Sequence, residues 1–199
     1  MLENLTTQCV LCRREGVKLY LKGRRCEGPM CGLTRRQSIP GQHGGKRTSR
    51  LSDYGKQLRE KQRVKRYYGL REKQFKIYYE QALKSKGNTG ELLLIMLERR
   101  LDNVAYRLGW GLSRPSSRQI IKQGKVLVNG KKITSPSFIL SEGDSLQFEG
   151  QETFLAKTTA PAWLERSEDS KKAKITRLPE RSDIAADIDE QLIVEFYSR

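Results

Sequence analysis

The four cysteines of the 199-residue chain all lie in one short basic segment, and this cluster most constrains how the N-terminal part can fold. Their spacing is Cys9-x2-Cys12-x13-Cys26-x4-Cys31. A gap of two residues lets neighbouring thiolates bind one tetrahedral ion, and the second pair can form a similar knuckle. Four thiolates suit a closed, structural zinc site without an open position for catalysis. The spacing therefore predicts a Zn2+ ion held by these four residues.

Spacing alone leaves other uses of the thiols open. An iron–sulfur cluster also takes four cysteines, and two disulfides or unliganded thiols are the remaining alternatives. Between the two pairs, apolar and polar residues alternate in VKLYLKG, which predicts a short strand that brings the pairs together. A bound metal would supply folding free energy that so small a segment cannot gain from burial.

The sequence indicates a cytoplasmic protein without a membrane partner. The first residues, MLENLTTQ, lack a basic region followed by an apolar stretch, so no secretory signal is expected. The longest aliphatic run, LLLIML, falls far short of the ~20 residues that span a bilayer. In the cytoplasm, clustered cysteines hold a metal more often than they form disulfides.

Charge is concentrated in blocks of one sign. The whole chain has 39 Lys and Arg against 23 Asp and Glu. Residues 1–87 carry a net charge of +15 and residues 99–140 one of +8, whereas residues 141–199 carry −5. Such blocks favour a polyanionic partner, most often nucleic acid, over a merely soluble surface.

His43 is the only histidine in the chain. No orienting carboxylate or nucleophile stands near it in the sequence, so an RNA-contacting or packing role is the preferred interpretation. The scarcity of histidine also argues against Ser/His/Asp and Cys/His mechanisms. We therefore expect no enzymatic activity, no catalytic residue and no small-molecule substrate.

Helical periodicity covers the middle of the chain. Ser52 is a typical N-cap for a basic helix, and a second helix is expected over 71–84. A long helix with an apolar stripe is predicted over 91–108, and Ser113 caps a shorter one.

Strand signals follow the helices. Asn129-Gly130 is the favoured two-residue turn of a hairpin in KVLVNGKKIT. Further strands are expected at 138–140 and 152–157, whereas 158–181 reads as irregular and charged. The apolar end of the chain, 192–197, should dock on the body. The predicted fold class is α+β, with an N-terminal metal knuckle and helical domain followed by a small helix-pair and antiparallel-sheet domain.

A series of motifs stands in order along nearly the whole chain. They are the cysteine segment with REGVKLYLKG, PGQHG, YGKQLREKQRVKRYYG, ERRLDNVAYRLG, GKVLVNGKKI, PAWLE and EQLIVEFYSR. In this order and spacing they resemble the bacterial type of the small-subunit ribosomal protein four family.

That resemblance implies a structural constituent of the small ribosomal subunit. Members bind small-subunit (16S) ribosomal RNA early in assembly at a multi-helix junction. They contribute to the region where messenger RNA enters and is decoded, and to translational accuracy. The implied partners are this RNA, the neighbouring ribosomal protein five of the small subunit, and messenger RNA. The implied location is the cytoplasmic ribosome.

Composition and resemblance together predict three segments. Residues 1–45 form the cysteine knuckle and a basic extension, and residues 46–90 a helical RNA-binding domain that about 182–199 completes. Residues 91–181 form a second domain, in which the resemblance places a small RNA-binding module at about 99–159.

RNA phosphates are expected to be bound by basic side chains on both domains. In the first block the candidates are Arg13, Arg14, Arg24, Arg35, Arg36, His43, Lys46, Arg47, Arg59, Arg63, Lys65 and Arg66. In the second block they are Arg114, Arg118, Lys122, Lys125, Lys131 and Lys132.

Two other classes of protein fit the sequence less well. An RNA-modifying enzyme with the same small module needs a further catalytic domain, whereas only about forty residues follow the module. A zinc-finger DNA-binding protein needs a recognition helix between or after the ligands, where a strand is expected here.

Overall fold

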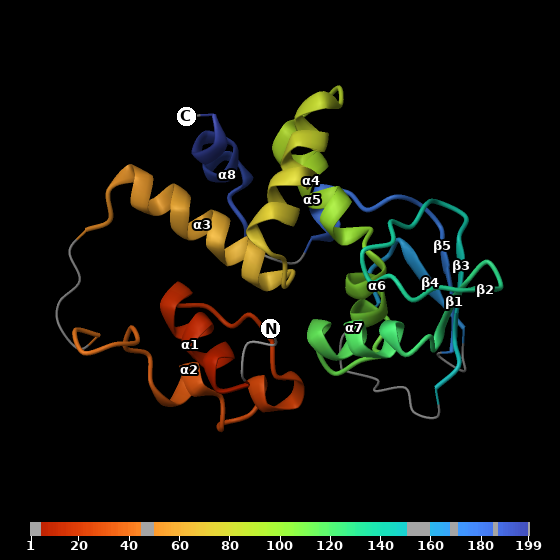
Figure 1. Ribbon diagram of the computed structural model, residues 1–199, viewed down its shortest axis with the longest axis horizontal. Coiled ribbons are helices and arrows are strands. Elements are labelled where there is room, and N and C mark those ends of the chain that lie inside the picture. The colour runs from red at the N-terminus through yellow and green to blue at the C-terminus, as the bar shows by residue number, and fades with distance from the viewer. Residues whose placement is uncertain (1–4, 45–49, 151–159, 168–170, 185–186, 199) are drawn as a thin grey trace. The chain divides into compact units, whose positions relative to one another are not determined.

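In the computed structural model, the described residues are 5–44, 50–150, 160–167, 171–184 and 187–198. The chain divides into two compact units (Figure 1). Unit 1 comprises Met1–Glu72 and Ile188–Arg199, and unit 2 comprises Lys73–Asp187. The predicted α+β class is confirmed, since the described part of the chain forms both helices and an antiparallel sheet.

The regular elements of unit 1 are all helical among its described residues. They are α1 (Leu5–Glu15), the 3-10 helix η1 (Gly23–Cys26), α2 (Gly32–Arg35), α3 (Asp53–Tyr67) and α8 (Glu190–Tyr197). The predicted basic helix with Ser52 as its N-cap is confirmed, because the Ser52 hydroxyl accepts a hydrogen bond from the Gly55 N–H at 3.2 Å.

The end of the chain returns to pack on α3, as its apolar composition predicted (Figure 1). The carboxylate of Asp189 caps α8 by accepting hydrogen bonds from the N–H groups of Gln191 and Leu192. Ile193 is fully buried, and the Gln57 side-chain amide donates to the Glu195 carboxylate at 2.9 Å. The helices α3 and α8, which are far apart in the sequence, thus pack into one core.

The cysteine segment does not contain the short strand that was predicted between the two cysteine pairs. Cys9 and Cys12 lie on α1, and no strand forms over 17–21 among the residues that the structure describes. Residues three apart on a helix share a face, so α1 presents the thiols of Cys9 and Cys12 on the same side. Leu19 and Leu21 pack with Cys12 in the small core of this segment, which explains their alternation in the sequence.

Four helices open the second part of the chain. They are α4 (Glu72–Lys84), α5 (Thr89–Glu98), α6 (Leu101–Arg107) and α7 (Arg114–Lys122). The predicted helix over 71–84 and the helix capped by Ser113 are confirmed, and the Ser113 hydroxyl accepts from the Ser116 N–H.

The predicted continuous helix over 91–108 is wrong. Arg100 adopts an extended conformation (φ −66°, ψ 136°) between α5 and α6. At this break the Leu101 N–H donates to the Phe138 carbonyl at 2.8 Å, so the backbone pairs with a distant segment instead of its own helix. The expected strand at 138–140 is therefore also wrong, since it is reduced to a single bridge between Arg100 and Ile139.

The sheet of unit 2 is antiparallel with strand order β2-β1-β3-β5-β4 in the described part. The strands are β1 (Val126–Val128), β2 (Lys131–Lys132), β3 (Ser145–Phe148), β4 (Leu164–Arg166) and β5 (Lys172–Ile175), followed by the 3-10 helix η2 (Arg181–Asp183).

The predicted hairpin is confirmed, with both residues of the Asn129-Gly130 turn at positive φ. Residues 158–181 are not irregular as expected, because β4 and β5 fall there. The expected strand at 152–157 lies outside the described residues.

One face of this sheet is covered by α6 and α7. The core between helices and sheet is built by Val104 of α6, Leu108 just after α6, Ile121 of α7 and the inward strand residues. Trp110 stacks on Phe148 with ring centroids 5.5 Å apart. No helix among the described residues is long and apolar enough to cross a membrane.

Candidate nucleic-acid interface and cysteine cluster

All four cysteines line one small cavity of unit 1. Its free space is about 10 Å³, close to the minimum that one water-sized sphere requires. Gly32 borders Cys9 so closely that a Cβ at this glycine would lie 2.9 Å from the Cys9 Cβ. The absence of a side chain there is what lets the two cysteine pairs approach.

The thiols differ in their electrostatic surroundings. Burial raises the pKa of Cys12 and of Cys26, and the other cysteines nearby raise it further. Burial also acts on Cys31, but backbone and side-chain hydrogen bonds from Leu33 and Thr34 outweigh it and lower the pKa of this thiol. The Lys22 N–H also donates to the Cys26 sulfur at 3.3 Å.

These cysteines are free thiols. Within the described ranges, no group of three or more His, Cys, Asp or Glu side chains is arranged so that it could hold a metal ion. The shared cavity nevertheless supplies four sulfur donors, which is the ligand set of a structural zinc or iron–sulfur site. Metal binding at this site stays a prediction.

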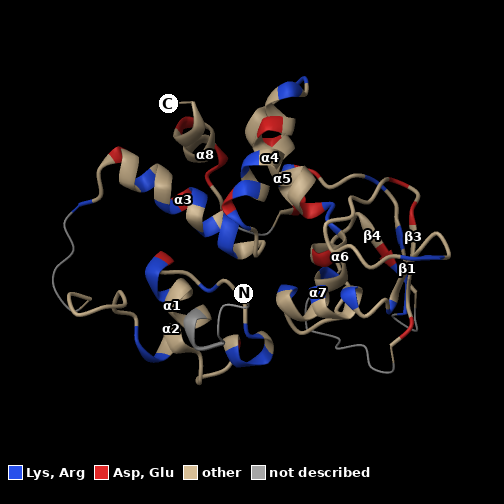
Figure 2. Ribbon diagram, in the orientation of Figure 1, with Lys and Arg blue, Asp and Glu red and all other residues tan. Residues whose placement is uncertain are grey.

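Basic side chains recur along α3 and around α1 and α2 (Figure 2). Several of those on α3 form ion pairs within unit 1. Arg59 and Arg66 both bind the Glu15 carboxylate, whose side chain is 1% exposed. Burial raises the pKa of Glu15 against the opposing effect of these arginines. The pairs fix the end of α1 on α3.

Glu72 at the start of α4 binds two lysines of α3. Its oxygens lie 2.6 Å from Lys61 Nζ and 2.7 Å from Lys65 Nζ, and Tyr197 of α8 donates to the same carboxylate at 3.1 Å. Lys61 is buried, and its ammonium also lies 4.6 Å from the Phe196 ring centroid. A buried cation is tolerated here because a carboxylate and an aromatic face surround it.

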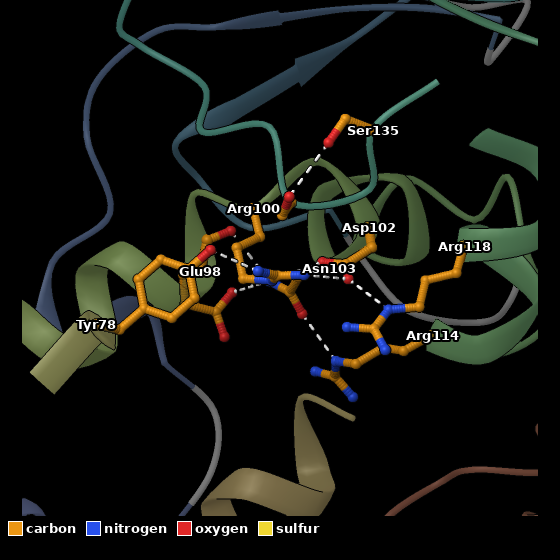
Figure 3. A network of polar contacts seen from close by, with 9 residues as sticks. Tyr78, Glu98, Arg100, Asp102, Asn103, Arg114, Arg118 and Ser135 are labelled. Carbon is orange, nitrogen blue, oxygen red and sulfur yellow. Dashed lines mark hydrogen bonds and ion pairs between the residues drawn. The ribbon is translucent and has the colours of Figure 1, made fainter. Parts of the chain in front are cut away.

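A buried polar network connects the helices of unit 2 (Figure 3). Asp102, which is 2% exposed, binds Arg100 through both carboxylate oxygens, at 3.1 and 2.7 Å. Arg100 also donates to the Tyr78 hydroxyl at 2.5 Å. Burial alone would lower the pKa of Arg100, but Asp102 and Tyr78 outweigh it and raise this pKa.

The same network reaches α7. The Arg118 Nε donates to Asp102 at 2.7 Å, and the Arg114 Nε donates to the Asn103 side-chain carbonyl at 2.8 Å (Figure 3). The Asn103 amide in turn donates to the Glu98 carboxylate at 2.6 Å. One cluster therefore sets the angle between α6 and α7, and Glu98, Asp102 and Asn103 were not anticipated from the sequence.

The predicted RNA-binding residues differ in how far their side chains are exposed to solvent. Exposed side chains are Arg14, Arg24, Arg35, Arg36, His43, Lys122, Lys125, Lys131 and Lys132. Partly buried ones with internal partners are Arg13, Arg59, Arg63, Lys65, Arg66 and Arg118. Arg114 is 3% exposed and so offers little surface to a ligand. Lys46 and Arg47 lie outside the described residues.

Two family models match consecutive parts of the chain. Residues 4–98 match the ribosomal protein S4/S9 N-terminal domain, and residues 99–146 match the S4 domain. Full-length similarity is equally clear with the small ribosomal subunit protein uS4 of three bacteria. The sequence is 49% identical to that of Dictyoglomus turgidum, 46% to that of Thermus thermophilus and 51% to that of Clostridium tetani, each over 96% of both chains.

The S4 domain match and the similarity to small-subunit proteins identify an RNA-binding structural component of the ribosome. The chain belongs to the small ribosomal subunit protein uS4 family. This membership confirms the predicted absence of enzymatic activity, because uS4 proteins are structural. It also agrees with the predicted location in cytoplasmic ribosomes.

The ion pairs of Glu72 with Lys61 and Lys65 predict that unit 1 loses stability in acid. Burial by itself would raise the pKa of Glu72, but hydrogen bonds from Lys61 and Lys65 and their charges hold it at about 2. An unfolded glutamate has a pKa of about 4.3, so folding favours the ionised form. The stabilisation is complete above that unfolded value and is lost as the pH falls from ~4.3 toward the folded value. Solvent weakens the effect, because the Glu72 side chain is 48% exposed.

Urea unfolding of unit 1, followed by NMR signals of α3 between pH 6 and pH 2, measures this loss. We expect Glu72→Gln to lower the stability at pH 6 and to flatten its pH dependence. Glu27→Gln is the matched control, since Glu27 is an exposed glutamate of the same unit. Parallel pH curves for the wild type and Glu72→Gln would contradict the assignment.

Proposed function

We propose that the chain binds small-subunit ribosomal RNA at a multi-helix junction early in assembly, with each unit gripping a different RNA helix. The observation that carries the proposal is the separation of cations into internal and exposed groups, together with uS4 family membership. Exposed Lys and Arg neutralise phosphates and release counterions, so affinity falls with salt. Folded RNA is recognised mainly by its shape and by phosphate and 2′-hydroxyl contacts.

In unit 1, the exposed arginines next to the cysteine segment form the first surface. They are Arg14, Arg24, Arg35 and Arg36. Arg13 is held in place, since its Nε donates to the Ser38 carbonyl at 2.9 Å. This bond ties α1 to the segment after α2, so the arginines are presented on a folded support.

In unit 2, the second surface runs from the end of α7 into the first hairpin. It consists of the exposed lysines Lys122, Lys125, Lys131 and Lys132. Arg118 adds a partly exposed guanidinium that Asp102 orients. The hairpin lies against the end of α7, since a Cβ at Gly124 would clash with Lys132 Cε, and this contact brings the two groups of lysines together.

Further partners are proposed on the basis of the family resemblance. They are ribosomal protein five of the small subunit and messenger RNA where it enters and is decoded. Contact with the decoding region would give the chain a part in translational accuracy.

We also propose that Cys9, Cys12, Cys26 and Cys31 hold Zn2+, with an iron–sulfur cluster as the alternative. The support is their common cavity, the lowered pKa of Cys31 and the N–H donated to the Cys26 sulfur. When bound, such a metal supplies structural cross-linking and no reaction chemistry. It would join α1, η1 and the start of α2, which present the exposed arginines.

The RNA proposal predicts a specific change in salt dependence. Replacing Lys122 and Lys125 by Gln should weaken binding of a small-subunit rRNA transcript. It should also reduce the slope of log K against log salt by about 1.4–1.8, the effect of two lost phosphate contacts. Filter binding at several salt concentrations measures both quantities.

The control for this experiment is Lys84→Gln with Lys86→Gln, which removes the same charge from exposed positions at the end of α4 and just after it. It should leave the slope unchanged. Equal affinity of the wild type for duplex DNA and for the rRNA transcript would count against the proposed function.

The metal proposal predicts a local effect of cysteine removal. Replacing Cys9 and Cys12 by Ala should release the metal and increase amide exchange over residues 1–50, because the cross-link between α1 and the second pair is lost. The module at 99–159 should keep its protection. Elemental analysis distinguishes zinc from iron, and an equal rise of exchange in both regions would contradict independent units.

A further inference from the structure

The sheet of unit 2 has a second face that no described helix covers. Along β3 and β5, buried and exposed residues alternate strictly. Leu146 and Ala173 point into the core under α6 and α7, whereas the residues beside them in sequence face the other way. The face opposite the helix pair is therefore polar and open.

An open groove of about 440 Å³ crosses this face. Its polar lining comes from three adjacent strands and their ends. The principal side chains are Ser145, Gln147, Glu165, Arg166, Lys172 and Lys174. The strand register places Gln147 opposite Lys172, and Ser145 opposite Lys174.

The groove is positively charged. Lys172 and Lys174 project from this face beside a single carboxylate, Glu165, and Arg166, which lies opposite Ala173 in the register, borders the groove at its edge. Both lysines are exposed, and neither makes an ion pair with any residue in the described ranges. Glu165 lies opposite Lys174 in the register of β4 and β5, and the lining keeps a net positive charge that an external anion can meet.

The spacing and chemistry of the lining favour a sugar-phosphate backbone. Lys172 and Lys174 are two residues apart on one strand, so their side chains leave the sheet about 7 Å apart. Successive phosphates of an RNA strand can meet such a pair, while Ser145 and Gln147 offer hydrogen bonds to phosphate or 2′-hydroxyl oxygens.

The lining does not suit a protein partner or stacked bases. Protein interfaces depend on buried aromatic or apolar anchors in pockets, and base stacking needs an exposed aromatic face. The groove's apolar members, Leu146 and Ala173, are 2% and 6% exposed and serve the core instead.

We infer that this groove is an additional RNA-binding site, which takes a strand of ribosomal RNA by its backbone on the side of unit 2 away from α6 and α7. The inference rests on the proposed function, since it adds a contact to the same RNA. Unit 2 would then be held between two RNA segments, one on the helix and hairpin surface and one on the open sheet face.

The test removes the two lysines of the groove. Full-length Lys172→Gln with Lys174→Gln should bind a small-subunit rRNA transcript more weakly than the wild type. The slope of log K against log salt should fall by about 1.4, the value for two phosphate contacts on a single strand. Lys84→Gln with Lys86→Gln removes the same charge outside the groove and should leave the slope unchanged.

A second variant, which adds a positive charge, distinguishes a lost RNA contact from a folding defect. Gln147→Arg adds a cation at an exposed position of the groove and should strengthen binding and steepen the slope by about 0.7. An unchanged slope in the double Gln variant and in Gln147→Arg would overturn the inference while leaving the proposed function intact. Failure of the wild type to bind the transcript would instead overturn the proposed function.

A photoreactive amino acid in place of Gln147 identifies the occupant within reconstituted small subunits. Cross-links to ribosomal RNA are expected. Cross-links to a ribosomal protein, with none to RNA, would show that the groove is a protein-binding surface and would overturn the inference.

Discussion

Glu98 and Asp102, two buried carboxylates in the described part of unit 2, neutralise arginines that could not otherwise enter the core. Asp102 binds Arg100 and Arg118, and Glu98 binds Arg107 at 2.9 Å. An unpaired buried charge costs several kcal/mol, on the order of 3–5 when one partner of a pair is removed. The break between α5 and α6 and the packing of α7 on α6 therefore depend on these two acids.

This network also explains how a chain with a net charge of +16 can form a compact core. Like charges repel one another in the compact state. In each unit, buried or half-buried cations are paired with a carboxylate, as Arg66 is with Glu15 and Lys61 with Glu72, whereas the buried Arg114 donates to the side-chain carbonyl of Asn103. The exposed cations then remain for phosphates, and the internal pairs fix the helices that carry them.

Local signals in the sequence predicted much of the fold. The caps at Ser52 and Ser113 and the Asn129-Gly130 turn have short-range causes, so they could be read from a few residues. The break at Arg100 could not, because it depends on a backbone partner near Phe138.

The candidate site was less accessible to sequence reasoning. In the sequence Arg114 is typical of a surface cation, whereas in the structure it donates to Asn103. Lys172 and Lys174 belong to a candidate site only because β5 lies at the open face of the sheet. The alternation in KAKI was the signal for β5. A run of charged residues before it led to the prediction of an irregular segment.

The stability of unit 2 after the loss of one charge from the network tests most directly whether its buried arginines depend on their carboxylates. Both tryptophans, Trp110 and Trp163, lie in the core of this unit, so their fluorescence during urea unfolding reports on it alone. Asp102→Asn should lower the free energy of unfolding by about 3–5 kcal/mol, whereas Lys122→Gln should change it by less than about 0.5 kcal/mol. Equal stability of Asp102→Asn and the wild type would show that the buried arginines do not need their carboxylate, and would contradict the division of cations proposed here.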